Sequence, residues 1–454
     1  MPNNFMRSLD HPAWVAVLLS AALASNAAGA NRYTRHNLVS DIPGVADQTD
    51  PNLVNPWGIS MSSTSPFWIS NNHSGVASVY NGQGQPTPAA SPIVVRIPVP
   101  PGDTQAAAPT GQVFNDTTGF SVFGQPATFI FATEDGTISG WSPAADRVNS
   151  FVLVDNSTLG AVYKGLAIAS TGNGPMLYAA NFQAGTIDVF DANLMPVAST
   201  GSFSDPNLPA GFAPFNIQRI GRKLYVTYAR QDEAKHDDVA GTGNGFVDVF
   251  DFNGNLLGRL ASNGALNSPW GLAIAPTNFG EFSNALLVGN FGDGRINAFD
   301  PCSGEYLGNL QDSGGVAIAN PGLWALSFGN GRGAGDANTL YFTAGIPGPG
   351  NVEDHGLFGG IQAVDAAPAA QPQLSPATIN NFAFMPSTVT IAAGTQIQWT
   401  NQDGTAHTVT ADDNRFHSDF LDQGQTFSQT FSAPGTYPYH CSIHPFMKGK
   451  IVVQ

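Results

Sequence analysis

Residues 31–366 repeat a short pattern, and this repeat limits the possible fold more than any other feature of the sequence. Each unit has two short apolar runs, then a glycine-containing turn and a third run that typically ends in an aromatic residue and aspartate. The third runs begin at residues 76, 137, 186, 246, 295 and 360, so the unit recurs every 49 to 65 residues. Short runs without a 3.6-residue period predict strands, and a unit of this size is typical of a propeller blade.

We therefore predict an all-β chain in which residues 31–366 form a six-bladed β-propeller. The three runs would be strands a, b and c of each blade, with a weaker outer strand d after them. The sixth unit has no strand d, and we expect residues 32–39 to supply it and close the ring, which removes an exposed sheet edge. The clearest runs are 57–60, 67–70 and 76–80, then 165–168, 177–180 and 186–191, then 270–274, 286–289 and 295–300; weaker runs are 129–132, 137–141, 224–227, 246–251, 340–343 and 360–365.

A segment rich in alanine, proline and glutamine follows the repeats at residues 367–376, and we predict an extended linker there. Residues 377–454 then contain runs with period-two alternation, which is typical of half-buried strands. These runs predict a small Greek-key β-sandwich as a second domain. They span residues 389–391, 397–399, 427–431 and 451–453.

Three candidate metal ligands, Cys441, His444 and Met447, lie on one short loop between two strand-like runs. A thiolate, an imidazole and a thioether close together suit a soft or borderline metal, above all copper. A mononuclear type 1 copper site needs a second histidine from elsewhere in the chain, and His407 is the candidate. The alternatives are a zinc site and a plain buried thiol beside a surface histidine.

The loop and its flanks resemble amicyanin, a short-loop member of the plastocyanin-like cupredoxins. The resemblance covers residues 377–454 and rests on Tyr437-Pro-Tyr-His-Cys441, on the spacing Cys441-x2-His444-x2-Met447 and on Lys448-Gly-Lys-Ile-Val-Val453. It implies a cupredoxin fold and single-electron transfer through one type 1 copper ion, with His407, Cys441, His444 and Met447 as ligands. Ala406 stands where amicyanin has proline before the first histidine, and this departure concerns the tuning of the site rather than its ligands.

The same resemblance implies a docking face for a redox partner protein. In this class the loop histidine, here His444, lies at the surface among apolar residues such as Pro445 and Phe446. The N-terminal repeats are similar to NHL-type propellers and to a family of secreted bacterial propeller proteins with no assigned activity. That likeness implies a fold and no chemistry, so we expect the propeller to be a docking or positioning module.

The remaining cysteine and two nearby histidines are expected to play no part in metal binding. His440 precedes Cys441 on one strand, so its side chain should point to the opposite face. His417 lies in a loop and matches no ligand of the family. Cys302 sits in a turn, and it cannot form a disulfide with Cys441 if Cys441 binds copper.

Polar residues gather in the predicted turns between strands b and c, all on one face of the ring. Asn, Asp and His in turns usually serve the turn conformation, and the histidines fall in blades that cannot all meet, so no catalytic centre is expected. Two alternatives stay open: a propeller enzyme that oxidises or hydrolyses a small molecule, with the cupredoxin as electron acceptor if it is an oxidase, and a copper-storage protein. The turn residues are His73, Glu134, Asp135, Asn181, His236, Asp237, Asp238, Asn290, Asp293, Asp354 and His355.

Charge and the N-terminal segment limit the partners and the location. The formal net charge is −16 and no cluster of lysine and arginine is present, so nucleic acid and anionic membrane surfaces are excluded as partners. Residues 1–30 resemble a secretory signal, with Arg7, an apolar run at 13–24 and a small-residue cleavage site at 28–30. The apolar run is shorter than the roughly 20 residues that span a bilayer. We predict a periplasmic or extracellular protein without a membrane span.

Overall fold

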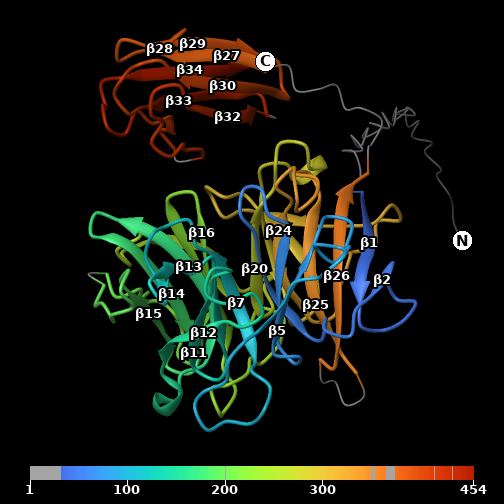
Figure 1. The fold of residues 1–454 in the computed structure, drawn as a ribbon. Coiled ribbons are helices and arrows are strands. Elements are labelled where there is room, and N and C mark those ends of the chain that lie inside the picture. Colours follow the sequence, from blue (N-terminus) through green and yellow to red (C-terminus); the bar gives the residue numbers. More distant parts are fainter. Residues whose placement is uncertain (1–31, 200, 349–352, 365–373, 414, 432) are drawn as a thin grey trace, which may run out of the picture.

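The computed structural model describes residues 32–199, 201–348, 353–364, 374–413, 415–431 and 433–454 (Figure 1). The regular secondary structure of these ranges is almost entirely β-strand, as predicted, and their only helices are two 3-10 turns, η1 (Ser157–Leu159) and η2 (Gly280–Phe282). No helix in the described part of the chain is long and apolar enough to cross a bilayer. The predicted signal segment 1–30 and most of the predicted linker lie outside the described residues.

Six sheets of three to five strands lie within residues 33–363, one for each predicted repeat. The first three are β3 (Pro56–Ser60), β4 (Phe67–Asn71), β5 (Val76–Tyr80) and β6 (Val94–Arg96); β7 (Pro109–Phe114), β10 (Phe129–Thr133), β11 (Thr137–Trp141) and β12 (Phe151–Asp155); and β13 (Tyr163–Thr171), β14 (Gly174–Asn181) and β15 (Thr186–Phe190). The next two are β16 (Phe212–Ile220), β17 (Lys223–Arg230), β18 (Phe246–Phe250) and β19 (Leu256–Ser262); and β20 (Pro269–Ile274), β21 (Leu286–Asn290), β22 (Ile296–Phe299) and β23 (Tyr306–Asn309). The sixth is β24 (Leu323–Phe328), β25 (Leu340–Ile346), β26 (His355–Ala363), β1 (Tyr33–Ser40) and β2 (Gln48–Thr49), and a separate hairpin joins β8 (Ser121–Val122) to β9 (Gln125–Pro126).

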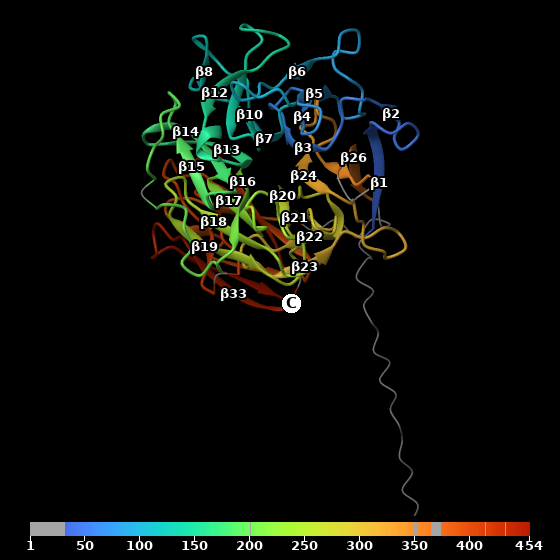
Figure 2. The ribbon, with the colours of Figure 1, turned by 90° about the horizontal axis from the view of Figure 1, so that it is seen from below.

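The first strand of each repeat lies nearest to the centre of this domain (Figure 2). These inner strands, β3, β7, β13, β16, β20 and β24, contact one another in chain order, and β24 also contacts β3. Glycine makes the close approach possible: a Cβ at Gly111 would lie 2.6 Å from the Cα of Gly165, and one at Gly271 would lie 2.5 Å from the backbone oxygen of Trp324. Glycine at these positions is therefore a packing requirement.

The N-terminal strand completes the last sheet, which confirms the predicted pairing of residues 32–39. β1 runs antiparallel to β26, from Tyr33 opposite Ala363 to Ser40 opposite Leu357. Tyr33 is buried, and its hydroxyl donates to the backbone oxygen of Phe279 at 3.0 Å. The two ends of the domain are thus held together by one strand pair.

β26 departs from the sequence prediction because it begins at His355 rather than at residue 360. His355 therefore lies in a strand and not in a turn. The start of this strand could not be predicted because it contains Gly356, Gly359 and Gly360, and glycine is rare in strands. Gly356 is needed there because a Cβ would lie 2.0 Å from the backbone oxygen of Leu53.

An aromatic cluster fills the centre of the domain where the inner strands begin. It consists of Trp57, Phe182, Phe215, Trp270, Phe291 and Trp324. The rings of Trp57 and Trp324 stack with centroids 3.5 Å apart. The indole N–H of Trp270 donates to the backbone oxygen of Lys164 at 3.2 Å. The three tryptophans are therefore packing residues of this core.

The C-terminal domain is a sandwich of two four-stranded sheets (Figure 1). One sheet has the order β28 (Phe384–Met385), β27 (Leu374–Ile379), β30 (Thr395–Asn401), β32 (Thr426–Phe431), and the other has the order β29 (Thr388–Ile391), β34 (Lys448–Val453), β33 (Gly435–His440), β31 (Thr410–Ala411). Burial alternates along β30, as the period-two pattern predicted. The first strand begins at Leu374, before the predicted domain start at residue 377.

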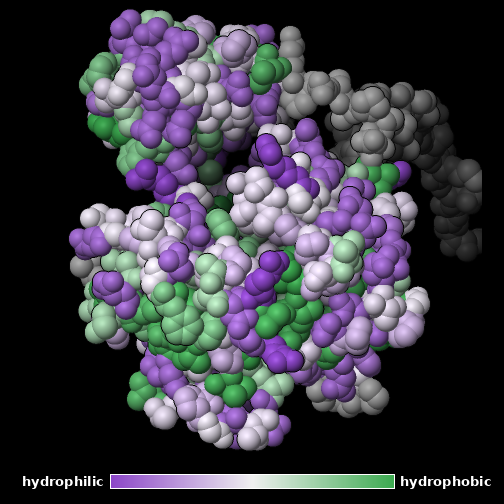
Figure 3. Space-filling model, viewed as in Figure 1, coloured by the Kyte–Doolittle hydropathy of each residue, from purple (hydrophilic) through white to green (hydrophobic). Residues whose placement is uncertain are grey.

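Among the described residues, side-chain contacts between the two domains involve the sandwich loop 417–420, and only part of the facing surfaces is in contact (Figure 3). The ammonium of Lys223 lies 3.1 Å from Nε2 of His417, and the Cys302 thiol lies 4.0 Å from the His417 backbone oxygen. The guanidinium of Arg222 lies 5.8 Å from the centre of the Phe420 ring. The contact comes from turns of the fourth and fifth sheets.

Candidate metal centre

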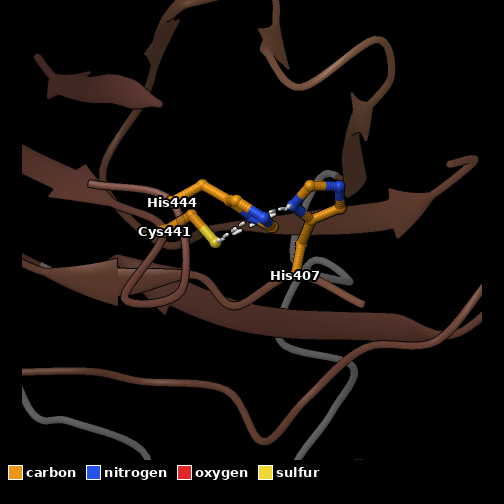
Figure 4. Close-up of side chains that lie close together, drawn as sticks. All are labelled: His407, Cys441 and His444. Carbon is orange, nitrogen blue, oxygen red and sulfur yellow. Dashed lines mark hydrogen bonds between the residues drawn. The ribbon is translucent and has the colours of Figure 1, made fainter. Parts of the chain in front are cut away.

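The candidate ligands come from two places in the sandwich (Figure 4). Cys441 directly follows β33, Met447 directly precedes β34, and His444 lies on the loop between them. Backbone hydrogen bonds fix this loop, from Cys441 N to Met447 O at 3.1 Å and from Met447 N to His444 O at 2.9 Å. His407 reaches the loop from the segment before β31, where its backbone pairs with Leu421.

The structure brings His407, Cys441 and His444 into one triangle of donor atoms. The Cys441 Sγ lies 3.8 Å from Nδ1 of His407 and 3.7 Å from Nδ1 of His444, and the two nitrogens are 3.2 Å apart. The point equidistant from all three atoms lies about 2.1 Å from each, which is close to the 2.0–2.3 Å of metal bonds to histidine nitrogen and cysteine sulfur. The donor set fits a single metal ion.

Met447 lies in the same buried core as Cys441. Both side chains are almost fully buried, with exposed fractions of 2% and 0%. The thioether is held in this core by the loop that carries the other two ligands. Its place is compatible with a weak fourth ligand to the same ion.

Asp403 orients His407 from the side away from the triangle. Its carboxylate accepts a hydrogen bond from Nε2 of His407 at 3.0 Å, which leaves the Nδ1 lone pair for the triangle. The same carboxylate accepts the backbone N–H groups of Asn381 at 2.7 Å and Phe382 at 2.9 Å. Burial raises the pKa of Asp403, but the hydrogen bonds from Phe382, Asn381 and His407 together lower it below its usual value.

Thr408 supports the sulfur. Its backbone N–H donates to the Cys441 Sγ at 3.3 Å. Its hydroxyl accepts the backbone N–H of Ser442 at 2.7 Å, which ties the loop to the segment that carries His407. Hydrogen bonds to the cysteine sulfur are one of the features that tune the potential of type 1 copper sites.

Apolar side chains surround the half-buried His444 at the surface. Phe446 is 71% exposed, Phe382 is 42% exposed, and Pro445 and Ile443 are exposed beside them. The Phe382 ring stands edge-on to both imidazoles, with centroids 5.2 Å from His407 and 5.0 Å from His444. Sequence reasoning missed Phe382, because it comes from the turn between β27 and β28, far from the ligand loop.

His440, His417 and Cys302 lie outside the donor triangle. His440 points away from the triangle and pairs with Asp412 at 2.6 Å, as predicted. Both cysteines are free, and Cys302 contacts His417 at the domain interface. Burial and the nearby Lys223 lower the pKa of His417, which favours its neutral form. The sequence placed His417 and Cys302 in a loop and a turn and did not show that these meet.

A second cluster of metal-binding residue types lies in the N-terminal domain, with Glu134, His236 and Asp237 close together. Its centre is Lys164, whose side chain is only 2% exposed. The Lys164 ammonium lies 2.6 Å from Glu134 and 3.5 Å from Asp237, and 5.2 Å from the centre of the Trp57 ring. The sequence did not show that the turn residues Glu134 and Asp237 come together, with Lys164 between them.

Among the described residues His73, His236 and His355 form no common group, and each has a different polar neighbour. His355 pairs with Asp41 at 2.7 Å, His73 lies 3.5 Å from the Asn55 amide, and His236 pairs with Asp237 at 2.9 Å. Lys164 itself was not singled out by the sequence analysis. The sequence feature that could have pointed to Lys164 is its position inside the otherwise apolar inner strand Tyr163-Lys-Gly-Leu-Ala-Ile168.

Negative charge exceeds positive charge around Lys164, and this excess affects the pKa of the nearby Glu353. Burial, together with the nearby Glu134, Asp238 and Asp237, raises the pKa of Glu353 to about 7. Burial lowers the pKa of Lys164, but Glu134 and Asp237 raise it by more, so the ammonium stays charged. This cluster is an ion network inside the domain, and its cation is part of the chain.

Comparison with known proteins agrees with the sandwich and its donor triangle. Residues 360–453 match the family model described as Cupredoxin-like domain. Amicyanin-alpha of Methylorubrum extorquens is 38% identical over 101 residues, which cover 21% of this chain and 82% of that protein. The fold, the site and this similarity define a β protein with a cupredoxin domain.

A larger share of the chain is similar to a viral protein. The uncharacterized protein R648 of Acanthamoeba polyphaga mimivirus is 34% identical over 320 residues, which cover 68% of this chain and 76% of the mimivirus protein. The chain therefore belongs to the same family as the mimivirus protein, and its C-terminal domain belongs to the cupredoxins. A solved purple cupredoxin from Nitrosopumilus maritimus aligns at 28% identity, over 18% of this chain and 99% of its own, with a TM-score of 0.17.

Proposed function

We propose that this protein is an exported carrier of single electrons, with one type 1 copper ion held by His407, Cys441, His444 and, as a weak axial ligand, Met447. The observation that carries the proposal is the donor triangle with edges of 3.2, 3.7 and 3.8 Å. Copper bound there would supply the change of oxidation state that moves one electron. Two nitrogens and one sulfur with a buried thioether suit copper better than zinc, which prefers four strong ligands.

The chain's own residues hold the donors in one arrangement. Asp403 fixes the His407 ring, Thr408 holds the Cys441 sulfur, and backbone bonds close the loop from Cys441 to Met447. Side chains supported in this way do not have to rearrange when the charge at the centre changes. The buried core around Cys441 and Met447 keeps water away from the sulfur atoms.

The exposed apolar residues around His444 are proposed as the docking face for a redox partner protein. They are Phe382, Ile443, Pro445 and Phe446. Contiguous exposed apolar groups mark interaction sites on soluble proteins. His444 lies among them and touches the donor triangle, so it offers the shortest route between a docked partner and the metal.

The N-terminal domain is proposed to be a six-bladed, NHL-like β-propeller at residues 31–366 that positions the copper domain. Support comes from the six sheets and from inner strands that contact one another around the centre. Lys223, Arg222 and Cys302 hold the loop next to the His407 segment. Residues 1–30 are proposed to direct export to the periplasm or the extracellular space, and residues 367–376 to link the domains.

The test is the visible absorption and EPR spectrum of the copper-loaded full-length protein. We expect an intense thiolate-to-copper charge-transfer band that Cys441→Ser abolishes, because the band requires the sulfur. Cys302→Ser is the matched control and should leave the band unchanged. Met447→Leu should shift the reduction potential and keep the copper, since the axial ligand is weak. A colourless copper-loaded protein with reduced Cys441 would refute the proposal.

A further inference from the structure

The contact between the two domains places a histidine against a lysine. His417 lies in the sandwich loop 417–420, and its Nε2 is 3.1 Å from the ammonium of Lys223, at the start of β17. An ammonium group can only donate, so Nε2 is the acceptor and carries no proton. The neutral ring then has its proton on Nδ1, and a second proton has to enter at Nε2, the atom that faces the ammonium.

Two carboxylates face this pair and favour a charged histidine. They are Asp419, on the same loop, and Asp300, in the turn after β22. The Asp300 carboxylate is bound by its own turn, where it accepts the backbone N–H of Cys302 at 2.9 Å. Burial and the Lys223 ammonium outweigh both carboxylates and lower the pKa of His417. The contact therefore favours the neutral ring.

The neighbouring thiol, hydroxyl and guanidinium keep their charge state near neutral pH. Burial raises the pKa of the Cys302 thiol, and burial together with Cys302 and Asp419 raises the pKa of the Tyr225 hydroxyl to about 12. The guanidinium of Arg222, beside the Phe420 ring, is always charged. Histidine is the side chain that ordinarily changes its charge between about pH 5 and 8, so His417 is the titrating group of this contact.

A proton on Nε2 of His417 removes the acceptor of the Lys223 hydrogen bond and sets two positive charges 3.1 Å apart. We propose that acid separates the two domains: they stay in contact while His417 is neutral and part when it takes up a proton. The other described side-chain contacts are an exposed cation–π pair, Arg222 with Phe420, and the weak thiol donor of Cys302, and both oppose the repulsion only weakly. The separation does not depend on copper, because His417 lies outside the donor triangle.

Proton uptake by His417 favours the open form in which the domains are apart. Contact with the other domain holds the pKa of His417 below the 6.5 of a free histidine, so the closed form binds fewer protons than the open form in acid. The ratio of closed to open molecules should therefore fall as the pH decreases below that value. Since one proton is taken up, the ratio should fall by at most about tenfold per pH unit.

The test is small-angle X-ray scattering of the full-length protein between about pH 7.5 and 5.5, read on the monomer peak from gel filtration. We expect the radius of gyration to rise as the pH falls. His417→Gln keeps an acceptor for Lys223 that takes up no proton, so its radius should stay constant. The control His36→Gln removes an exposed histidine outside the contact and should behave like the wild type.

A second variant, Lys223→Gln, tests the repulsion itself. Its amide can donate to a neutral His417 and accept from a charged one, so its radius should also stay constant. Circular dichroism checks that each variant is folded, and either variant decides alone if the other is not. A wild-type radius that does not change with pH, or a folded variant whose radius rises as in the wild type, overturns the proposal.

Discussion

The two clusters of metal-binding residue types in this protein differ in their donor atoms, in their burial and in the source of positive charge. Each gathers three donor side chains whose ligand atoms lie within 4.8 Å of one another. In the N-terminal cluster the Lys164 ammonium stands 2.6 Å from Glu134, so the chain provides its own cation. In the C-terminal cluster two imidazole nitrogens and a sulfur face one another, and no lysine or arginine of the described residues pairs with them.

The comparison teaches that proximity of ligands does not by itself define a metal centre. Carboxylates that lie close together need a positive charge, which can come from a side chain or from an ion. Where a lysine fills this need, the cluster stabilises the fold. Where none does, as around Cys441, the same density of donors is available to a metal.

The largest effect is expected from removing the Lys164 ammonium, the cation that the chain supplies to the N-terminal cluster. Lys164→Ala leaves Glu134 and Asp237 without their partner, and we expect a loss of about 3–5 kcal/mol in the free energy of unfolding. Urea unfolding measures it, with the exposed Lys235→Ala as control. Mn²⁺ should restore part of the stability of the variant and leave the wild type unchanged. Equal stabilisation of both proteins by Mn²⁺ would mean that the cluster takes a metal even with Lys164 present.

The excess negative charge near Lys164 predicts a pH dependence of stability. The pKa of Glu353 is about 7 in the folded protein, against 4.5 for the free side chain. The folded state therefore holds more protons between these values, so the free energy of unfolding falls as the pH rises from about 4.5 to 7, by at most about 3 kcal/mol.

Glu353→Gln should flatten that part of the stability–pH profile, because its amide does not titrate. Unfolding curves at several pH values measure the effect, and the exposed Glu233→Gln is the control. A profile that keeps its slope in Glu353→Gln would show that another group holds the proton.

In the C-terminal domain, the effect of the carboxylate that orients His407 can be compared with that of a similar carboxylate–histidine pair nearby. Asp403→Ala frees the His407 ring, and we expect copper affinity to fall about 10–100-fold. Asp412→Ala removes the same kind of carboxylate–histidine pair next to the site, at His440, and should leave the affinity unchanged. Competition with a copper chelator measures both, and similar losses in both variants would contradict a specific role for Asp403.

The smallest effect is expected from separating the domains. Residues 374–454 contain both sheets and all four candidate ligands, and their described contacts with the other domain are few. Expressed alone, this segment should fold, bind copper and show the same visible spectrum. It loses one hydrogen bond, from Lys223 to His417, and one cation–π contact, of Arg222 with Phe420, so its stability should change by about 2 kcal/mol at most. An insoluble or metal-free product would show that the interface is part of the core.

Much of this structure could be predicted because the relevant signals are local. The first and fifth repeats give their strands nearly to the residue, since each run is short, apolar and bounded by turns. The third repeat gives only the centres of its first two strands, which extend to Tyr163–Thr171 and Gly174–Asn181. The loop from Cys441 to Met447 carries three candidate ligands within seven residues. The structure adds how His407 reaches them, through backbone pairing with Leu421.

What the sequence did not show depends on contacts between distant segments. The inner strands β7 and β16 mix proline, glycine and polar residues with apolar ones, so they lack a clear run. The role of Lys164 depends on its contacts with Glu134 and Asp237, which come from two other repeats. Phe382 and His417 reach their partners only through the folded sandwich and the domain contact.

The pairing of β1 with β26 also sets the order in which the two domains can mature. β1 is synthesised before the other strands of its domain, yet its partner ends at Ala363, so an elongating chain carries an unpaired strand until almost the whole domain exists. Contacts this far apart in the sequence are slow to form because the entropy of closing the loop must be overcome first. Residues 374–454 face no such delay, since their strands pair only with one another. The copper domain can therefore fold as soon as it is synthesised, whether or not its larger neighbour has finished.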